Sequence, residues 1–332
     1  MAAQSNIPPL GKYLASTDKK TRDKAIKSLA TFLSDPSKDE LPKLEMAKLW
    51  KGIFYCMSRA VAFLGDDTDL VVGFWMSDKP LVQQALASEI AEILLTISST
   101  PASLGFLRGF WEAIVREWSG IDRLRIDKYY MLVRRFVNAS FRLLMRAEWD
   151  EAFCKEYISI MTDRGGPLCA GDSRVPSSLA YHIADIYLEE LNKAIARPPI
   201  PSPHPAPLCS ILSPFFTLAA CTPSNVTYRR IQSAVIDPLF DALSADFDKP
   251  AVQKCTKSLT SSYEHIIGNS CAMDSKTEGI LDKDALKKVL LKQLFNVASE
   301  QDTRDSNRRK LYAVWKSHMD DNEGNEKPVD AS

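Results

Sequence analysis

Residues 110–146 read FWEAIVREWSGIDRLRIDKYYMLVRRFVNASFRLLMR, and the apolar residues in the second half of this stretch recur at the spacing of an α-helix. At about 100° per residue, six of them fall on one broad face of such a helix. They are Leu132, Val133, Phe136, Val137, Leu143 and Leu144. A face of this width is stable only when other elements cover it, so the stretch predicts a helix packed inside a protein built from helices.

The same helix also carries a row of cations, which we call the basic edge. Lys128, Arg135, Arg142 and Arg146 follow one another at intervals of 7, 7 and 4 residues. At a rise of about 1.5 Å per residue they would line one side of the helix over about 27 Å. With two arginines that precede the helix they form the candidate contacts for RNA phosphates or for an acidic partner surface. The six residues are Arg123, Arg125, Lys128, Arg135, Arg142 and Arg146.

The charge around this helix differs from that of the whole chain. Nine basic and four acidic residues lie between Arg108 and Arg146, whereas the full chain holds 42 of each sign. Such clustering can mark an electrostatic contact surface, and with a neutral chain any RNA contact must be local. The alternative is a solvated face whose arginines bond to acids on neighbouring helices. The spacing alone leaves both interpretations open.

Three segments carry a resemblance to a known family. They are LWKGIFYCM at 49–57, WMSDKPLVQQALASEIA at 75–91 and FWEAIVREWSGIDRLRIDKYYMLVRRF at 110–136. In this order they resemble the ribosomal RNA-processing protein 1 family, the Nop52-like nucleolar proteins of ribosome assembly. The clear similarity runs from Pro8 to Leu191 and a weaker one continues to Trp315.

This resemblance implies an all-α fold, a HEAT/armadillo-like array of antiparallel helix pairs. It also implies a non-enzymatic factor of the nucleus and nucleolus that supports pre-rRNA processing, chiefly of large-subunit precursors. The expected partners are the pre-ribosomal particle and other assembly factors, with no cofactor, metal, membrane or small-molecule substrate. The alternative is a direct RNA-binding protein whose basic edge contacts pre-rRNA phosphates.

One segment departs from the family pattern. In that pattern Tyr55 to Met57 continues directly into the motif that begins at Trp75, but here SRAVAFLGDDTDLVVGF intervenes at 58–74. A surface loop is one explanation, because the entropic cost of closing a loop rises slowly with its length. Translation of an unspliced intron is the other. We assign no function to this segment.

The chain reads as helix after helix, separated by proline, glycine and aspartate, without the period-2 pattern of a sheet. Asp18 is a plausible N-cap of the first helix, and 177–196 is an amphipathic helix. Six prolines within 197–207 suit an extended connector. We therefore expect a helical array at 1–196, with a possible insertion or artefact at 58–74, then the connector and a helical region at 208–319. Residues 320–332 are expected to be a disordered polar tail.

Motifs of catalysis are not found in the sequence. It contains neither GxxxxGK[ST] nor a GxGxxG motif after a strand, and its four histidines lie far apart. Seven cysteines without a CxxC pair are typical of reduced thiols, and we interpret Cys169 as incidental. With neither a signal peptide nor a long apolar run, we expect a soluble intracellular protein that is not an enzyme.

The aromatic residues of this region could in principle stack unpaired bases. Trp111 and Trp118 lie seven residues apart on one helix face with Val115, which favours burial between helices. Tyr130 lies at the border of the apolar face and is the better candidate for exposure. We expect core packing for this group.

Overall fold

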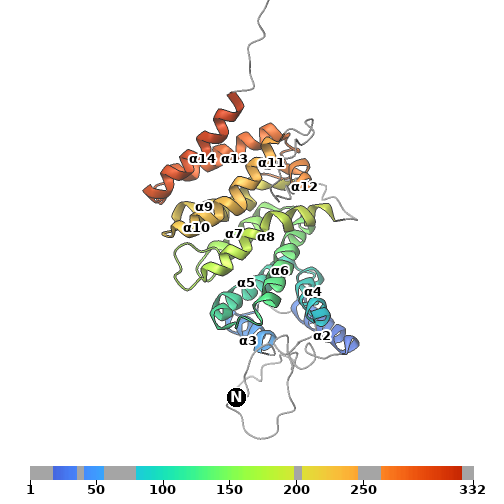
Figure 1. Ribbon diagram of the computed structural model, residues 1–332. Helices are drawn as coiled ribbons and strands as arrows, with labels where there is room; N and C mark the ends of the chain where they lie inside the picture. Colours follow the sequence, from blue (N-terminus) through green and yellow to red (C-terminus); the bar gives the residue numbers. More distant parts are fainter. Residues whose placement is uncertain (1–17, 36–40, 56–79, 198–203, 246–262, 324–332) are drawn as a thin grey trace, which may run out of the picture. The chain divides into compact units, whose positions relative to one another are not determined.

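The computed structural model describes residues 18–35, 41–55, 80–197, 204–245 and 263–323, and the described chain is almost entirely helical (Figure 1). The α-helices are α2 (Lys19–Leu33), α3 (Lys43–Tyr55), α4 (Pro80–Thr96), α5 (Thr100–Glu117), α6 (Ile126–Arg146), α7 (Glu151–Thr162), α8 (Ser177–Ala196), α9 (Leu208–Cys221), α10 (Asn225–Ile231), α11 (Asp237–Ser244), α12 (Glu264–Gly268), α13 (Lys283–Ser299) and α14 (Asp305–Glu323). The all-α prediction is confirmed, while the order of HEAT/armadillo-like repeats stays a prediction.

Four short elements lie between the α-helices of the described chain. A 3₁₀ turn, η2 (Trp118–Gly120), follows α5, and a π-helical turn, η3 (Gln232–Ile236), joins α10 to α11. Strands β1 (Ala206–Pro207) and β2 (Ser270–Cys271) pair in parallel. The end of the proline-rich connector is therefore held by a short backbone ladder.

The chain divides into two compact units. The first comprises Met1–Ala147 with Gly165–Pro167, and the second comprises Glu148–Arg164 with Leu168–Ser332. The connector predicted at 197–207 falls inside the second unit. Its residues 198–203, the segment 58–74 and most of the tail, 324–332, lie outside the described residues.

The chain passes between the units through an unusual backbone conformation. Glu148 and Trp149 both have a φ of 54°, in the left-handed region. This region costs a residue with a side chain about 1–2 kcal/mol. Trp149 is only 3% exposed, so burial of its indole offsets this cost.

Helices begin where capping residues stand. Asp18 accepts hydrogen bonds from the backbone N–H groups of Lys20 and Thr21, so its predicted role as the N-cap of α2 is confirmed. Ser99 caps α5 in the same way through Ala102 N. The helix predicted at 177–196 is α8, which starts directly after Pro176.

Aromatic rings form the core of the first unit where α3, α5 and α6 meet. The ring of Trp50 lies 4.5 Å from that of Phe106, and Phe110 stacks on Phe136 at 3.7 Å. The buried indole N–H of Trp50 donates to Phe106 O at 3.0 Å. Gly109 permits this approach, because a Cβ there would lie 2.5 Å from a ring carbon of Trp50.

A chain of hydroxyl groups links the core of the second unit. The hydroxyls of Tyr157 and Tyr187 lie 3.3 Å apart, and Tyr187 donates to Ile211 O at 2.8 Å. Pro214 lies inside α9 and provides no N–H for the preceding turn. The hydroxyl of Ser213 donates to Ser210 O at 2.8 Å, so the carbonyl that the proline leaves free has a partner.

Candidate functional site

Helix α6 carries most of the predicted contact residues and packs on α4 and α5 within the first unit. The six apolar residues that predicted its buried face are at most 1% exposed, which confirms the face. The exposure and the bonds of the cations therefore depend on two places. One is the contact between the flanks of α6 and α4, and the other is the turn that precedes α6.

Arg142 lies against α4. Its guanidinium donates to both carboxylate oxygens of Glu92, with a distance of 3.1 Å from Nη2 to Oε2 and a second bond from Nη1. The Arg142 side chain is 20% exposed and that of Glu92 is 45% exposed. This fork geometry fixes α6 against α4, and its donors are already in use.

Arg146 closes the C-terminal end of α4. Its Nη1 donates to Leu95 O at 2.8 Å and to Ile97 O at 3.1 Å, and its Nη2 lies 3.4 Å from Ser103 Oγ. The last carbonyls of a helix have no partner within the helix and carry a partial negative charge. A cation at this place therefore stabilises α4. Desolvation lowers the pKa of Arg146 from its ordinary value.

Lys128 stands in the first turn of α6 and is buried, with 6% exposure. Its side chain does not reach the surface. Together with Arg142 and Arg146, it shows that the predicted basic edge is not a continuous exposed row. Arg142 bonds to an acid on a neighbouring helix, as in the alternative interpretation, whereas Arg146 bonds to backbone carbonyls.

The corner between α5 and α6 is fixed by Asp122. Its Oδ1 accepts from Leu124 N at 3.1 Å, its backbone carbonyl accepts from Arg125 N at 3.1 Å, and its carboxylate pairs with Arg125 Nη1 at 2.5 Å. Asp122 and Arg125 thus form an ion pair at this corner. At its tip Leu124 is 95% exposed, beside the exposed Arg123.

The six candidate residues thus differ in what they can offer a partner. Arg123 and Arg135 are exposed, and within the described part of the chain they form no hydrogen bond or ion pair. Arg125 is partly exposed and paired with Asp122. Lys128 is buried, and Arg142 and Arg146 hold α4. The exposed arginines that form no bond within the described chain, Arg123 and Arg135, are grouped with the exposed Leu124 under the name α6 surface.

The aromatic residues of this region belong to the core, as expected. Trp111 is 1% exposed, Trp118 is 4% exposed and Tyr129 is 1% exposed. Tyr130 is half-buried, with its ring 5.5 Å from that of Trp118. A stacking surface for bases is therefore not available at the buried rings of α5 and α6.

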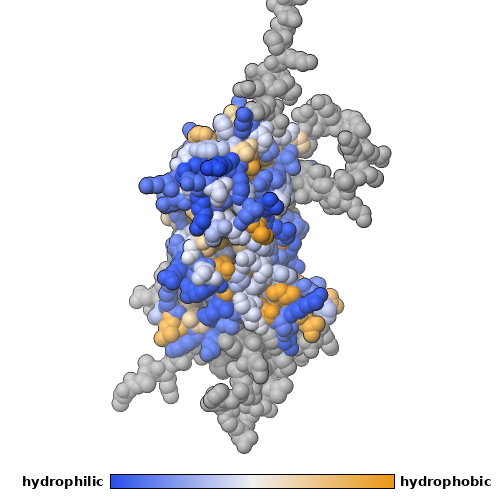
Figure 2. Space-filling model, turned by 60° about the vertical axis from the view of Figure 1, so that its left-hand side comes forward, coloured by the Kyte–Doolittle hydropathy of each residue, from blue (hydrophilic) through white to orange (hydrophobic). Residues whose placement is uncertain are grey.

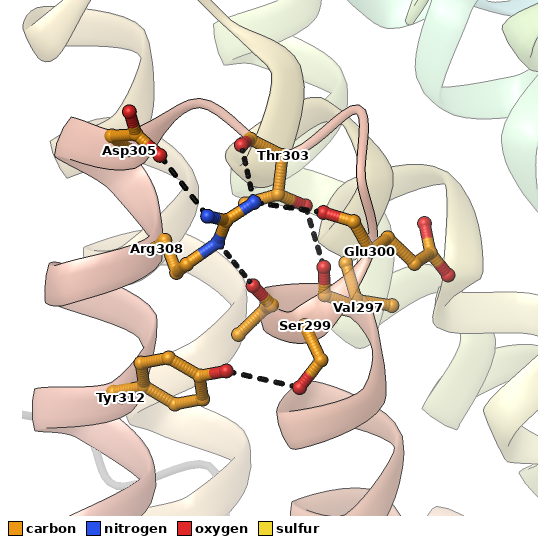
Figure 3. Close-up of polar contacts among 8 residues, drawn as sticks. Val297, Ser299, Glu300, Thr303, Asp305, Arg308 and Tyr312 are labelled. Atoms are coloured by element: carbon orange, nitrogen blue, oxygen red, sulfur yellow. Dashed lines mark hydrogen bonds and ion pairs between the residues drawn. The ribbon is translucent and has the colours of Figure 1, made fainter.

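A second surface, which the sequence reasoning missed, lies on α13 and α14. The turn between these helices is held by Arg308 (Figure 3). Its guanidinium donates to Ala298 O and Glu300 O at 3.0 Å and to Thr303 O at 3.1 Å, and it pairs with Asp305 at 3.0 Å. This turn brings Phe295 of α13 beside Tyr312 and Trp315 of α14.

The face drawn in Figure 2 has small, separate hydrophobic patches among polar residues. The large apolar side chains that are exposed among the described residues are Leu44, Leu81, Leu124, Val226, Met273, Ile280 and Phe295. No helix of the described chain combines the length and apolar character needed to cross a membrane.

Three cysteine thiols of the described chain are buried. Burial raises the pKa of Cys154, Cys209 and Cys271 to about 12, so these thiols are protonated at neutral pH and are poor nucleophiles. Within the described ranges, no group of three or more histidine, cysteine or acidic residues could hold a metal ion.

Comparison with known proteins identifies one family. The profile of the family described as "Nucleolar protein, Nop52" matches residues 5–60 and 70–315. Its interruption at 61–69 falls within the segment that departs from the family pattern.

Individual relatives carry one shared name. Human "Ribosomal RNA processing protein 1 homolog B" is 33% identical over 231 residues, which are 69% of this chain and 27% of the human protein. The mouse protein of that name is 26% identical over all of this chain and 46% of its own length. The homolog from Dictyostelium discoideum is 25% identical over 92% of this chain and 57% of its own length. The chain thus spans about half or less of these relatives.

Proposed function

Because the chain belongs to the Nop52 family of nucleolar proteins, we propose that it acts in ribosomal RNA processing. In this proposal it is a non-enzymatic assembly factor of the nucleolus. It joins pre-ribosomal particles, chiefly precursors of the large subunit, and holds other assembly factors in place. The observation that carries the proposal is the family match over residues 5–60 and 70–315.

The described residues support a scaffold more than an enzyme. The buried thiols are protonated, and most of the candidate arginines are used to hold helices together. Side chains fixed in this way give a rigid framework that can present surface residues to partners.

The α6 surface is the proposed contact for a protein partner. Leu124 is 95% exposed on a turn that Asp122 fixes, and Arg123 and Arg135 are exposed cations. An apolar side chain beside arginines suits a socket that is apolar within and acidic at its rim. Because the turn is already ordered, little conformational entropy is lost on binding.

The alternative function is direct binding of pre-rRNA by the same arginines. It is favoured by the excess of nine basic over four acidic residues between Arg108 and Arg146. A salt titration of purified chain with precursor RNA separates the two. If Arg123 and Arg135 contact phosphates, replacing both by Gln lowers the slope of log affinity against log salt by about 1.4 to 1.8.

The test of the main proposal is complementation in cells depleted of the endogenous protein. The chain should restore processing of the spacer-containing precursor RNA and should purify with large-subunit precursor particles. Leu124→Asp with Arg123→Glu should lose the partner proteins while the chain stays folded, because neither side chain is buried. The matched control is Lys24→Glu with Lys27→Glu on α2, at two exposed lysines.

Three outcomes are decisive. Failure of the unaltered chain to restore processing or to enter the particles would contradict the proposed function. Full activity of the variant Leu124→Asp with Arg123→Glu would reject the α6 surface as the contact for partners and would leave the proposed function standing. Loss of RNA binding by the Gln variant with partner proteins retained would favour the alternative function.

A further inference from the structure

Three aromatic side chains lie together on the surface of α13 and α14. The ring of Phe295 lies 5.3 Å from that of Tyr312 and 5.1 Å from that of Trp315, and the pairs are tilted by 50° and 53°. Phe295 is 39% exposed, and Tyr312 and Trp315 are partly exposed. We call these three side chains the aromatic platform. Unlike the buried rings of Trp111, Trp118 and Tyr129, it is partly accessible to solvent.

The platform is held in place by bonds within the hairpin. Tyr312 OH lies 3.0 Å from Ser299 Oγ, and Arg308 ties the turn through three backbone carbonyls (Figure 3). The rings therefore have a defined arrangement before any ligand is present. A preformed surface loses little entropy when it binds.

Basic residues outnumber acidic ones in the part of the hairpin nearest the platform. Residues 286–319 contain eight basic residues and three acidic ones. The acids, Glu300, Asp302 and Asp305, gather at the turn, and Asp305 is paired with Arg308. The other acids of the two helices are Asp284 near the start of α13 and Asp320, Asp321 and Glu323 at the end of α14.

Half of these basic residues serve the structure. Lys287 is buried, with 3% exposure. Arg304 donates to Cys221 O at 3.2 Å, and Lys310 donates to Asn225 Oδ1 at 2.7 Å. Arg308 holds the turn as described above. These four are not available to a ligand.

The other four basic residues are exposed and lie on the same two helices as the rings. In the described ranges, no hydrogen bond or ion pair engages Lys288, Lys292, Arg309 or Lys316. Lys288 and Lys292 precede Phe295 by seven and three residues, so they lie on its side of α13. Arg309 precedes Tyr312 by three residues, and Lys316 follows Trp315 directly.

We propose that this hairpin binds unpaired nucleotides of RNA. Bases stack on the exposed parts of Phe295 and Trp315, and Lys288, Lys292, Arg309 and Lys316 contact the phosphates. Aromatic rings combined with a cationic surface are the usual means of holding single strands, because every base has a face that can stack. A duplex does not fit, since its bases are already stacked on one another.

The inference rests on the proposed function only for the choice of RNA as the ligand class. It is independent of the α6 surface, which belongs to the other unit. An acidic protein segment would also be attracted by the four cations, but it has no need of exposed aromatic faces. The combination of exposed aromatic rings with cations therefore favours RNA over an acidic protein segment as the ligand.

The first experiment measures binding of the full chain to a labelled, unstructured oligouridine by fluorescence anisotropy at several salt concentrations. Lys288→Gln with Lys292→Gln should lower the slope of log affinity against log salt by about 1.4, the value for two phosphate contacts on a single strand. The matched control is Lys24→Gln with Lys27→Gln, which removes the same charge from exposed positions on α2. It should leave the slope unchanged.

The second experiment tests stacking. Trp315→Ala should weaken oligouridine binding about tenfold, with helix content checked by circular dichroism. Photo-crosslinking of 5-bromouridine RNA to the unaltered chain, followed by mass spectrometry, should place crosslinks on Trp315 or Tyr312. This second readout does not depend on the folding of a variant.

The proposal is overturned if the lysine variant behaves like its control, or if the crosslinks fall outside α13 and α14. Equal binding of an acidic peptide in competition with oligouridine would instead assign the hairpin to a protein partner. If the chain restores RNA processing in cells but binds no RNA, this inference fails while the proposed function stands.

Discussion

Arg142 on α6 and Glu92 on α4 form a bidentate ion pair, in which Nη1 donates to Oε1 and Nη2 donates to Oε2. The two residues lie 50 positions apart in the chain. The pair shows that an arginine in a basic row can serve packing between helices. Most cations of the row on α6 therefore serve structural contacts, whereas Arg135 is exposed and forms no bond within the described chain.

Replacing Arg142 should destabilise the chain modestly. Arg142→Ala removes the pair and leaves a partly exposed Glu92, so we expect the free energy of unfolding to fall by about 1 kcal/mol. Urea denaturation followed by circular dichroism measures the change. Arg135→Ala on the same helix is the control, because Arg135 is exposed and should change stability by less than about 0.5 kcal/mol. Equal effects of the two variants would contradict a structural role for the pair.

Replacing Arg146 should weaken the end of α4. Arg146→Ala leaves Leu95 O and Ile97 O without their donor, and we expect a loss of about 1–2 kcal/mol in the free energy of unfolding. Arg146→Lys should lose less, because it retains the charge near the carbonyls but not the fork of donors. The same denaturation measurement applies. A lysine variant as unstable as the alanine variant would show that charge at this end contributes nothing.

Replacing each of two glycines of α5 by alanine should change the stability of the chain in opposite directions. A Cβ at Gly109 would lie 2.5 Å from the Trp50 ring and 2.6 Å from Met46 Cγ, whereas a Cβ at Gly105 meets nothing within 4 Å. Gly109→Ala should therefore destabilise by about 1–3 kcal/mol through overpacking. Gly105→Ala should stabilise by up to about 1 kcal/mol through helix propensity. Thermal unfolding of the two variants beside the unaltered chain decides the matter, and a common sign would refute the close approach of α3 and α5.

Stability should fall in acid partly through Asp150. Its carboxylate pairs with Lys276 at 2.8 Å and accepts from Ala152 N at 3.0 Å, which lowers the pKa of Asp150 from its ordinary value. A lowered folded pKa means that this stabilisation is present above the unfolded pKa of about 3.9 and is lost as the pH falls through the folded value.

The variant Asp150→Asn isolates this effect, because asparagine still caps a helix but cannot ionise. At pH 7 it should be less stable than the unaltered chain, and the difference should shrink as the pH falls below about 4. Denaturation midpoints at several pH values provide the measurement. A difference that stays constant down to about pH 3 would exclude the ionised carboxylate as its source.

The sequence predicted the parts of the fold that depend on local patterns. The apolar period of α6 identified its buried face, and the residues after Pro176 gave the full extent of α8. The partner of Arg142 could not be predicted, because a period shows which face is buried and does not show which distant residue faces it. Tyr312 and Trp315 were missed for the same reason, since their neighbour Phe295 lies on another helix.

The boundary between the two compact units has a weaker signal in the sequence than the helices have. Prolines suggested a division at 197–207, whereas the compact units part at Glu148. Glu148 and Trp149 take up a positive φ without a glycine or asparagine to signal it, because burial of Trp149 compensates. Similarly, the π-helical turn at Gln232–Ile236 arises just before Pro238, in a stretch that reads as continuous helix.

The bonds of Arg308 have a consequence for how the hairpin comes apart. One guanidinium holds the last turn of α13, the connecting loop and the first turn of α14. Neither helix can fray at that end without breaking all of these contacts together. The hairpin should therefore open as a single cooperative unit, and amide protons on both sides of the turn should exchange with solvent at a common rate.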